Sequence, residues 1–406
     1  MDEASRGAPW LSIIGLGEDG LAGLGEAARA ALAGAGTVFG GARHLRLAAG
    51  GITGMAQSWP SPFSVAPVLA LRGQAVAVLA SGDPMWHGVG ATLLRDIPAG
   101  EARVFPQASA ASLAAARMGW PLAEVTVLSL HARDPALLRP HLHPGARLIL
   151  LTSDAAQPAA IAALLAAEGF ATSAITVLEA LGGSDERLRH ATAAAFDLDG
   201  IHPLNTLAIE VLAGPDARWL PRAPGLPDDL FQHDGQLTKR EVRAITLAAL
   251  RPFPGALLWD VGAGAGSIGI EWMLAHPACR AIGIEVRADR AARAEANARA
   301  LGVPGLRLVS GEAPAAFAGL PPPDALFLGG GANDPCVFDA ALAALKRGGV
   351  FVANAVTLET EALLLARHAA LGGELLRIGL SRAVAVGGMT GWRPAMPVTQ
   401  WVWHKP

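Results

Sequence analysis

Residues 259–269 read WDVGAGAGSIG, a stretch that joins the end of a predicted strand to a glycine-rich turn and a predicted helix. The apolar run ALLWDV at 256–261 precedes glycines at 262, 264 and 266, and SIGIEWMLA follows at 267–275. Glycine lets the backbone of such a turn approach a ligand closely. A second apolar run, AIGIE, ends on Glu285, and an acid at a strand tip can accept hydrogen bonds from a ribose. The pattern predicts a nucleotide-like cofactor. The alternative is a turn that packs a helix on a sheet without any ligand.

The acid before the first glycine distinguishes the two cofactors for which this pattern is typical. A dinucleotide brings a pyrophosphate to the helix N-terminus and usually requires a G-x-G-x-x-G turn. S-Adenosylmethionine carries no phosphate, but it has a cationic sulfonium and an amino group, and an acid such as Asp260 attracts both. We therefore expect the turn at 262–266 to bind S-adenosylmethionine.

Strand-like and helix-like runs alternate through both halves of the chain, which predicts an α/β protein. In the second half the runs predict a doubly wound, mostly parallel sheet with an antiparallel edge near the C-terminus. Residues 213–236 are rich in proline, glycine and charge and show neither a strand-like nor a helix-like pattern, so we predict a linker there. The expected domains are residues 10–212 and 237–406.

The first half contains two further glycine motifs. Residues 15–20 read GLGEDG, a G-x-G-x-x-G that suggests an NADP-dependent oxidoreductase in which Arg43 pairs a 2′-phosphate. Against this hypothesis, Glu18 and Asp19 place negative charge where a helix N-terminus should hold a phosphate. Residues 81–84 read SGDP, a turn that follows a buried apolar run and that is also common as a purely structural element.

Composition and charge restrict the function classes. The formal net charge is −3 and no basic cluster is present, so we expect no nucleic-acid partner. Apolar runs are too short to span a membrane and residues 1–10 do not resemble a signal peptide, so we expect a cytoplasmic protein without a membrane partner. Cys279 and Cys336 are too few for a metal framework; we expect no metal site and two packed side chains.

The first half carries a set of motifs that occur together in one family. In chain order they are GLGEDG at 15–20, SGDPMWHGVG at 81–90, PQASAASLAAARMGWP at 106–121, VLEALGGSDERLRHAT at 177–192 and PLNTLAIEV at 203–211. In order and approximate spacing they resemble the tetrapyrrole methylases. The resemblance covers about residues 10–212 and implies two α/β subdomains with S-adenosylmethionine bound in the cleft between them.

The second half carries a different set of motifs. They are QLTKREVRAITLAAL at 236–250, WDVGAGAGSIGIEW at 259–272, SGEAPAAF at 310–317, DALFLGGG at 324–331 and VFVANAVTLET at 350–360. This set resembles a decarboxylating, class I Rossmann-like precorrin methyltransferase. The two halves in this order resemble the precorrin-6Y methyltransferases of cobalamin biosynthesis. The resemblance implies a tetrapyrrole substrate, methylation at carbons 5 and 15 from two S-adenosylmethionine sites, decarboxylation of the ring C acetate, and assembly into a homo-oligomer.

The resemblance also implies which residues contact the cofactor. In the second half they are Thr238, Gly262, Ala263, Gly264, Ala265, Gly266, Glu285, which takes the ribose, and Ala313, beside the adenine. In the first half they are Gly15, Gly17, Gly82, Asp83 and Pro84. The chain departs from the family at His87, where tyrosine is usual, which leaves any role of that hydroxyl in doubt.

Basic side chains near the strand tips are candidates to hold the carboxylates of the substrate. We consider Arg382, Arg393 and Lys239 for this role, each of which is otherwise a solvated charge. Asn354, at the tip of VFVAN, is a candidate to face the substrate, and Asn354 and Arg382 are the candidate catalytic residues. After Asp324 the chain lacks the Pro-Pro-aromatic turn of enzymes that methylate exocyclic amines of bases, which leaves room for a bulky, flat substrate.

Overall fold

A computed structural model describes residues 9–406, and the chain divides into two compact units. Unit 1 comprises the chain up to Arg133 together with His143–Arg218, and unit 2 comprises Asp134–Leu142 and Trp219–Pro406. The segment expected as a linker therefore contributes mainly to unit 2. Leu226 and Phe231 are buried in the core of that unit. Apolar side chains spaced between prolines are enough to pack this segment, although it forms no strand or α-helix.

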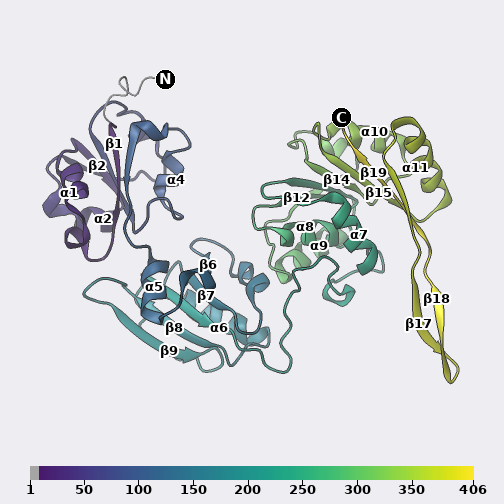
Figure 1. Cartoon of the computed structure of the whole chain (residues 1–406), viewed down its shortest axis with the longest axis horizontal. Coiled ribbons are helices and arrows are strands. Elements are labelled where there is room, and N and C mark those ends of the chain that lie inside the picture. Colours follow the sequence, from purple (N-terminus) through teal and green to yellow (C-terminus); the bar gives the residue numbers. More distant parts are fainter. Residues whose placement is uncertain (1–8) are drawn as a thin grey trace. The chain divides into compact units, whose positions relative to one another are not determined.

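The first sheet of unit 1 is parallel and has the strand order β3-β2-β4-β1-β5 (Figure 1). Its strands are β1 (Leu11–Leu16), β2 (Thr37–Gly40), β3 (Met55–Ser58), β4 (Val76–Ser81) and β5 (Ala102–Phe105). Its helices are α1 (Glu26–Ala33), α2 (Ala42–Leu47), α3 (Ala66–Leu69) and α4 (Val89–Leu93). In a dinucleotide-binding sheet the first strand neighbours the second, whereas here β4 separates them.

The second sheet of unit 1 is mixed, in the order β6-β7-β10-β8-β9. Its strands are β6 (Thr126–Ser129), β7 (Arg147–Leu151), β8 (Ala174–Glu179), β9 (Arg187–Thr192) and β10 (Asn205–Glu210), with helices α5 (Ala110–Met118) and α6 (Gln157–Ala167). Only β6 and β7 pair in parallel. Small side chains of α5, such as Ala111 and Ala114, pack against Ile149 and Leu178. The two layers confirm the predicted pair of α/β subdomains.

Unit 2 contains a seven-stranded sheet in the order β13-β12-β11-β14-β15-β19-β16. Its strands are β11 (Leu257–Val261), β12 (Arg280–Glu285), β13 (Arg307–Ser310), β14 (Ala325–Leu328), β15 (Val350–Ala355), β16 (Glu374–Ile378) and β19 (Val398–His404). The first five in this order pair in parallel, and β19 is antiparallel to both β15 and β16. The doubly wound sheet with its antiparallel edge is thus confirmed.

Alternate residues of these strands pack on opposite faces of the sheet. Leu258 joins a core with α7 (Arg240–Leu250), α8 (Ser267–Ala275) and α9 (Ala288–Ala300). Its neighbours Leu257 and Trp259 join a second core with α10 (Pro335–Ala344) and α11 (Leu358–Leu371). The period-two alternation of the strands therefore accounts for helices on both faces.

A two-stranded hairpin stands apart from the main sheet of unit 2 (Figure 1). It consists of β17 (Ser381–Val386) and β18 (Met389–Pro394), joined at Gly387-Gly388. Gly387 has a φ of 60°, the left-handed conformation that two-residue hairpin turns require. The sequence patterns did not predict this hairpin.

Candidate functional sites

The turn at 262–266 lies at the carboxyl edge of the unit 2 sheet. The amides of Gly262 and Ala263 donate to the carbonyl of Ile284, at the end of β12. The amides of Gly329 and Gly330 donate to the carbonyl of Val261, at the end of β11. Three strand ends therefore converge on this turn, the position where open α/β sheets bind ligands.

The three glycines of the turn have two different roles. All have positive φ, between 57° and 77°. A Cβ at Gly262 would clash with the backbone of Gly330, and a Cβ at Gly266 would lie 3.0 Å from that of Ala294 on α9. A Cβ at Gly264 would meet nothing closer than the Gln236 carbonyl, at 3.7 Å. Gly264 is therefore the position where the turn leaves space for a ligand, whereas its two neighbours allow close packing.

Glu285, at the end of β12, lies against this turn. Its side chain is 4% exposed, and Oε2 accepts a hydrogen bond of 2.8 Å from the Gly264 amide. Oε1 accepts one of 3.0 Å from the Arg287 amide. These two amides orient the carboxylate at the edge of the site.

Asp260 occupies a different position from the one its place in the sequence suggested. It is 2% exposed and accepts a hydrogen bond of 3.0 Å from the Gly269 amide in the first turn of α8. Burial, with a smaller contribution from Glu285, raises the pKa of Asp260 to about 7. Asp260 therefore connects β11 to the start of α8, and its carboxylate is buried beneath the turn.

Thr238 and Ala313 are on segments that reach the same edge. Thr238 precedes Lys239, the N-cap residue of α7, and its carbonyl accepts a hydrogen bond from buried Arg243. The nearby Gln236 carbonyl approaches Gly264. Ala313 follows β13, and at the end of that strand the Gly311 amide donates to the Glu285 carbonyl at 3.2 Å. Most of the predicted cofactor residues of unit 2 thus belong to segments that meet around Gly264 and Glu285.

The candidate substrate residues of unit 2 do not form one cluster. Asn354 donates to Thr246 at 3.0 Å and accepts from Gln400 at 2.9 Å, so its amide takes part in a largely buried network. Arg382 and Arg393 face each other across the hairpin, and Arg382 pairs with Glu241 on α7. Lys239 is the N-cap residue of α7. Cys279 is buried, but Cys336 is exposed, against the expectation that both are packed.

In unit 1 the two predicted glycine motifs are in direct contact. A Cβ at Gly15 would clash with the carbonyl of Gly82, whose amide donates to the Leu16 carbonyl at 3.1 Å. Gly82 has a φ of 51°, and its carbonyl accepts a hydrogen bond of 3.2 Å from the Gln107 amide. The chain enters α5 shortly after Gln107, so the Gly82 turn lies where the chain passes from the first sheet of unit 1 to the second.

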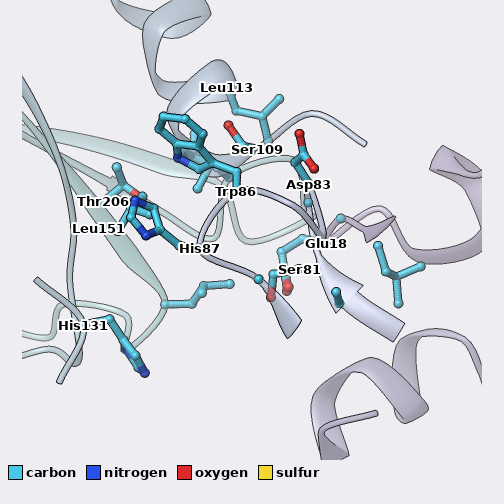
Figure 2. A pocket seen from close by; sticks show the side chains of 18 of the residues that line it. Glu18, Ser81, Asp83, Trp86, His87, Ser109, Leu113, His131, Leu151 and Thr206 are labelled. Carbon is cyan, nitrogen blue, oxygen red and sulfur yellow. The ribbon is translucent and has the colours of Figure 1, made fainter. Parts of the chain in front are cut away.

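A cavity of about 630 Å³ opens at this crossing (Figure 2). Gly17, Gly82 and Asp83 line it, together with Thr206 and Leu178 from the second sheet. Gly15 and Pro84 are buried behind the lining and shape the turn. Sequence reasoning missed other lining residues, among them Glu18, His44, Trp59 and Ser109. Glu18 lies inside the quoted motif GLGEDG and Ser109 inside PQASAASLAAARMGWP, whereas His44 and Trp59 lie in no quoted motif.

The loop after Gly82 is folded tightly on itself. Asp83 Oδ1 accepts a hydrogen bond of 2.8 Å from the Met85 amide, and a Cβ at Gly88 would approach the Pro84 carbonyl to 2.5 Å. Trp86 and His87 follow with their rings 5.4 Å apart, and the side chain of Trp86 is 48% exposed. The loop therefore presents a large apolar side chain at the cavity (Figure 2).

The arrangement around residues 15–20 does not suit a dinucleotide. After Gly20 the chain forms a short 3₁₀ turn, and α1 begins only at Glu26, so no helix N-terminus follows the glycines directly. Arg43, the expected partner of a 2′-phosphate, forms an ion pair with Glu18. Its guanidinium also donates to Ser81 Oγ at 2.8 Å.

Within residues 9–406, no group of three or more histidine, cysteine, aspartate or glutamate side chains is arranged to hold a metal ion. In the same part of the chain, no helix combines the length and hydropathy needed to cross a bilayer.

Comparison with known proteins agrees with the division of the chain into two units. The family profile described as Tetrapyrrole (Corrin/Porphyrin) Methylases matches residues 11–197, and the profile described as Precorrin methyltransferase domain matches residues 229–405. A crystal structure of the C-terminal domain of precorrin-6Y C5,15-methyltransferase from Rhodobacter capsulatus is 48% identical. It covers 45% of this chain and 98% of that one, with a TM-score of 0.43.

Two full-length relatives match almost the entire chain. A precorrin-6Y C(5,15)-methyltransferase [decarboxylating] of Sinorhizobium sp is 58% identical over 98% of this chain and 97% of its own length. One of Mycobacterium tuberculosis (strain CDC 1551 / Oshkosh) is 42% identical over 96% of this chain and 98% of its own. Identity at this level over almost the whole of each chain shows that the protein belongs to the family of the decarboxylating precorrin-6Y C(5,15)-methyltransferases.

Proposed function

We propose that this enzyme methylates precorrin-6Y at carbons 5 and 15 and decarboxylates the acetate side chain of ring C, as a step of cobalamin biosynthesis. The observation that carries the proposal is the 58% identity to a relative of that name across both units. The methyl donor of such a family is S-adenosylmethionine, which supplies an electrophilic methyl group.

The second unit contributes one donor site, at the turn 262–266. The space above Gly264, the oriented carboxylate of Glu285 and the segments of Thr238 and Ala313 together suit an adenosine group. Gly262, Ala263, Ala265 and Gly266 shape the turn. Because Asp260 is buried, it attracts the donor's cations only from a distance, whereas Glu285 accepts hydrogen bonds from the ribose hydroxyls.

The first unit contributes a second donor site, in the cavity beside Gly82. Its volume of about 630 Å³ falls within the range of small-molecule sites, roughly 300–1,000 Å³. Gly17 and Asp83 line the cavity, and Gly15 and Pro84 fix the backbone behind it. We assign methylation of carbon 5 to residues 10–212, and methylation of carbon 15 with decarboxylation to residues 237–406. Residues 213–236 connect the two.

Substrate carboxylates need cationic partners at the second site. Arg382 and Arg393 lie opposite each other on the hairpin, where Arg382 also pairs with Glu241, and a substrate carboxylate would share or replace that partner. Lys239 adds a charge at the start of α7. Asn354, at the carboxyl edge of the sheet, orients a substrate group with the part of its amide that the Thr246 and Gln400 network leaves free.

The hairpin also supports assembly into a homo-oligomer. Met389 and Trp392 are 79% and 76% exposed, and Val386 and Met396 are exposed nearby. Large apolar side chains concentrated on one protruding element are typical of a protein interface. We propose that a second copy of the chain covers them, and that the enzyme works in the cytoplasm.

Supplying the full-length protein with precorrin-6Y and S-adenosylmethionine tests this function. Mass spectrometry of the product should show the gain of two methyl groups and the loss of carbon dioxide. A product with fewer than two added methyl groups, or with its carboxylate retained, contradicts the proposal. The oxidoreductase hypothesis predicts tight NADP binding that an Arg43→Ala variant loses; the Glu18–Arg43 pair and the sheet order count against it.

A further inference from the structure

The cavity of unit 1 has a polar wall that the donor-site residues do not account for. Ser81 is the last residue of β4, and Arg43 and His44 lie in the first turn of α2. All three line the cavity, as does Glu18. Figure 2 shows Ser81 and Glu18 among the side chains that line the cavity.

Three polar atoms of this wall form a closed triangle. Arg43 Nη2 lies 2.8 Å from Ser81 Oγ and 3.0 Å from His44 Nε2, and His44 Nε2 lies 2.9 Å from Ser81 Oγ. A guanidinium only donates hydrogen bonds, so His44 Nε2 must accept in this arrangement. Ser81 Oγ accepts from Arg43, and its own hydrogen is directed to His44 Nε2.

This triangle fixes the state of the histidine. With Nε2 as acceptor, the single proton of a neutral imidazole resides on Nδ1, which is buried and has no hydrogen-bond partner. Burial, reinforced by the adjacent Arg43 charge, lowers the pKa of His44 to about 4. Glu18 pairs with Arg43 from the loop after β1, and Arg46 lies further along α2. His44 is thus a neutral base at pH 7, connected to the cavity through a serine hydroxyl.

We propose that Ser81 and His44 form a proton relay that accepts the proton released by methyl transfer in the unit 1 cavity. The inference rests on the proposed function. In such a transfer a carbon–carbon bond to the methyl group forms, the methyl–sulfur bond breaks, and its electron pair stays on sulfur. The acceptor macrocycle gains one positive charge and returns to its former charge by losing one proton. Ser81 Oγ receives this proton as its own hydrogen moves to His44 Nε2.

The surroundings suit a relay better than a static contact. A macrocycle that has just gained a methyl cation is a strong acid, so a weakly basic imidazole is sufficient to take its proton. The Arg43 charge then favours return of the proton from His44 Nε2 through the exposed Ser81 hydroxyl to water, which restores the starting state of the pair. Arg43 and Glu18 act as positioning residues. They hold His44 in the tautomer with its proton on Nδ1, and they act on the methyl acceptor only through Ser81 and His44.

The first test observes the resting state without any ligand. Nitrogen-15 NMR of histidine-labelled full-length protein should show His44 neutral at pH 7, with its proton on Nδ1. Free imidazole side chains prefer the proton on Nε2, so the assignment is distinctive. A His44 that carries its proton on Nε2, or that is protonated at pH 7, overturns the relay.

The second test measures the chemistry. With [methyl-¹³C]S-adenosylmethionine, Ser81→Ala and His44→Gln should lower the turnover number for carbon 5 methylation by about a hundredfold. Carbon 15 methylation should remain within about threefold. Added imidazole should partly restore carbon 5 methylation in His44→Ala, and calorimetry should show unchanged affinity of S-adenosylmethionine for unit 1. His190→Gln is a matched control, because His190 pairs with the Thr176 hydroxyl at 2.9 Å outside the lining of the cavity.

The two possible failures have different signatures. Carbon 5 methylation that stays within threefold of wild type in both Ser81→Ala and His44→Gln overturns the relay and leaves the proposed function intact. Wild-type protein that adds no methyl group at carbon 5 contradicts the proposed function, and the relay with it.

Discussion

At the scale of single residues, the glycine-rich turn of unit 2 divides into positions that pack and one position that leaves room. Gly262 lets the turn approach the backbone of Gly330, and Gly266 lets it approach α9. Only Gly264 has open space where a side chain would stand. The spacing of glycines in the sequence indicated the turn, but it did not distinguish these roles.

Replacing Gly264 by arginine should block the donor site of unit 2 alone. The side chain would enter the space above the turn, and its positive charge would oppose a cationic donor. Titration calorimetry should show two S-adenosylmethionine sites per chain in wild type and one in Gly264→Arg. Gly255→Arg is the matched control, because Gly255 has a φ of 85° and open surroundings in the same unit. Two remaining sites in Gly264→Arg contradict this assignment.

Asp260 should make the start of α8 less stable as the pH rises. Because its pKa is raised to about 7 from its usual 3.8, the stabilisation is complete below pH 4 and is lost as the pH rises to 7. Hydrogen exchange, corrected for intrinsic rates, should show that protection of the Ile270 and Glu271 amides falls between about pH 4 and pH 7. Asp260→Asn should remove most of that dependence. Equal pH dependence in both proteins would contradict the buried, raised-pKa carboxyl.

At the scale of elements, one buried arginine connects the inter-domain segment to the donor site of unit 2. Arg243 on α7 contacts Glu271 on α8, Asp228, and the carbonyls of Leu226 and Thr238. Glu271 in turn accepts from the amides of Gly225 and Leu226. The segment before α7 is therefore held in place on two helices, and Thr238 with it.

Arg243→Met should weaken both folding and cofactor binding in unit 2. It leaves Glu271 buried without its cation, and breaking a buried pair from one side costs about 3–5 kcal/mol. Chemical denaturation should show this loss, and the dissociation constant of S-adenosylmethionine at unit 2 should rise. Arg243→Met with Glu271→Met should recover part of the stability but not the affinity, since Thr238 stays unanchored. Full recovery of both quantities would contradict the positioning role.

The sequence predicted helices and strands better than it predicted the contacts between residues that are far apart along the chain. The strands of the unit 2 sheet and its antiparallel edge follow from apolar runs with turn residues between them. The hairpin was missed because its strands bury little, although Gly387-Gly388 is a typical hairpin turn. The triangle around His44 was not predictable, because His44 and Ser81 are 37 residues apart and meet only through the pairing of β2 with β4.

The hairpin of unit 2 should control the oligomeric state. Met389→Ser with Trp392→Ser removes the most exposed apolar side chains of this element and should shift the protein toward the monomer. Sedimentation velocity measures this shift. Trp219→Ser is the control, since Trp219 is 51% exposed outside the hairpin. An unchanged sedimentation coefficient in the double variant would exclude the hairpin as the main interface.

At the scale of the whole molecule, the chain joins two unlike folds that serve one type of chemistry. Unit 1 forms its cavity where a parallel and a mixed sheet meet, whereas unit 2 forms its site at the carboxyl edge of a single sheet. The two architectures share no strand order. The central claim of this account is that each unit carries its own donor site and adds its own methyl group.

The most direct test of that claim compares the products of two variants, each blocked in one unit. Gly264→Arg fills the open position of unit 2, and Gly82→Arg disrupts the turn beside the unit 1 cavity. Each full-length variant is supplied with precorrin-6Y and [methyl-¹³C]S-adenosylmethionine, and ¹³C NMR locates the added methyl groups. We predict a methyl group at carbon 5 alone from Gly264→Arg and at carbon 15 alone from Gly82→Arg. Loss of both methyl groups in either variant, with the protein folded by circular dichroism, would contradict two independent sites.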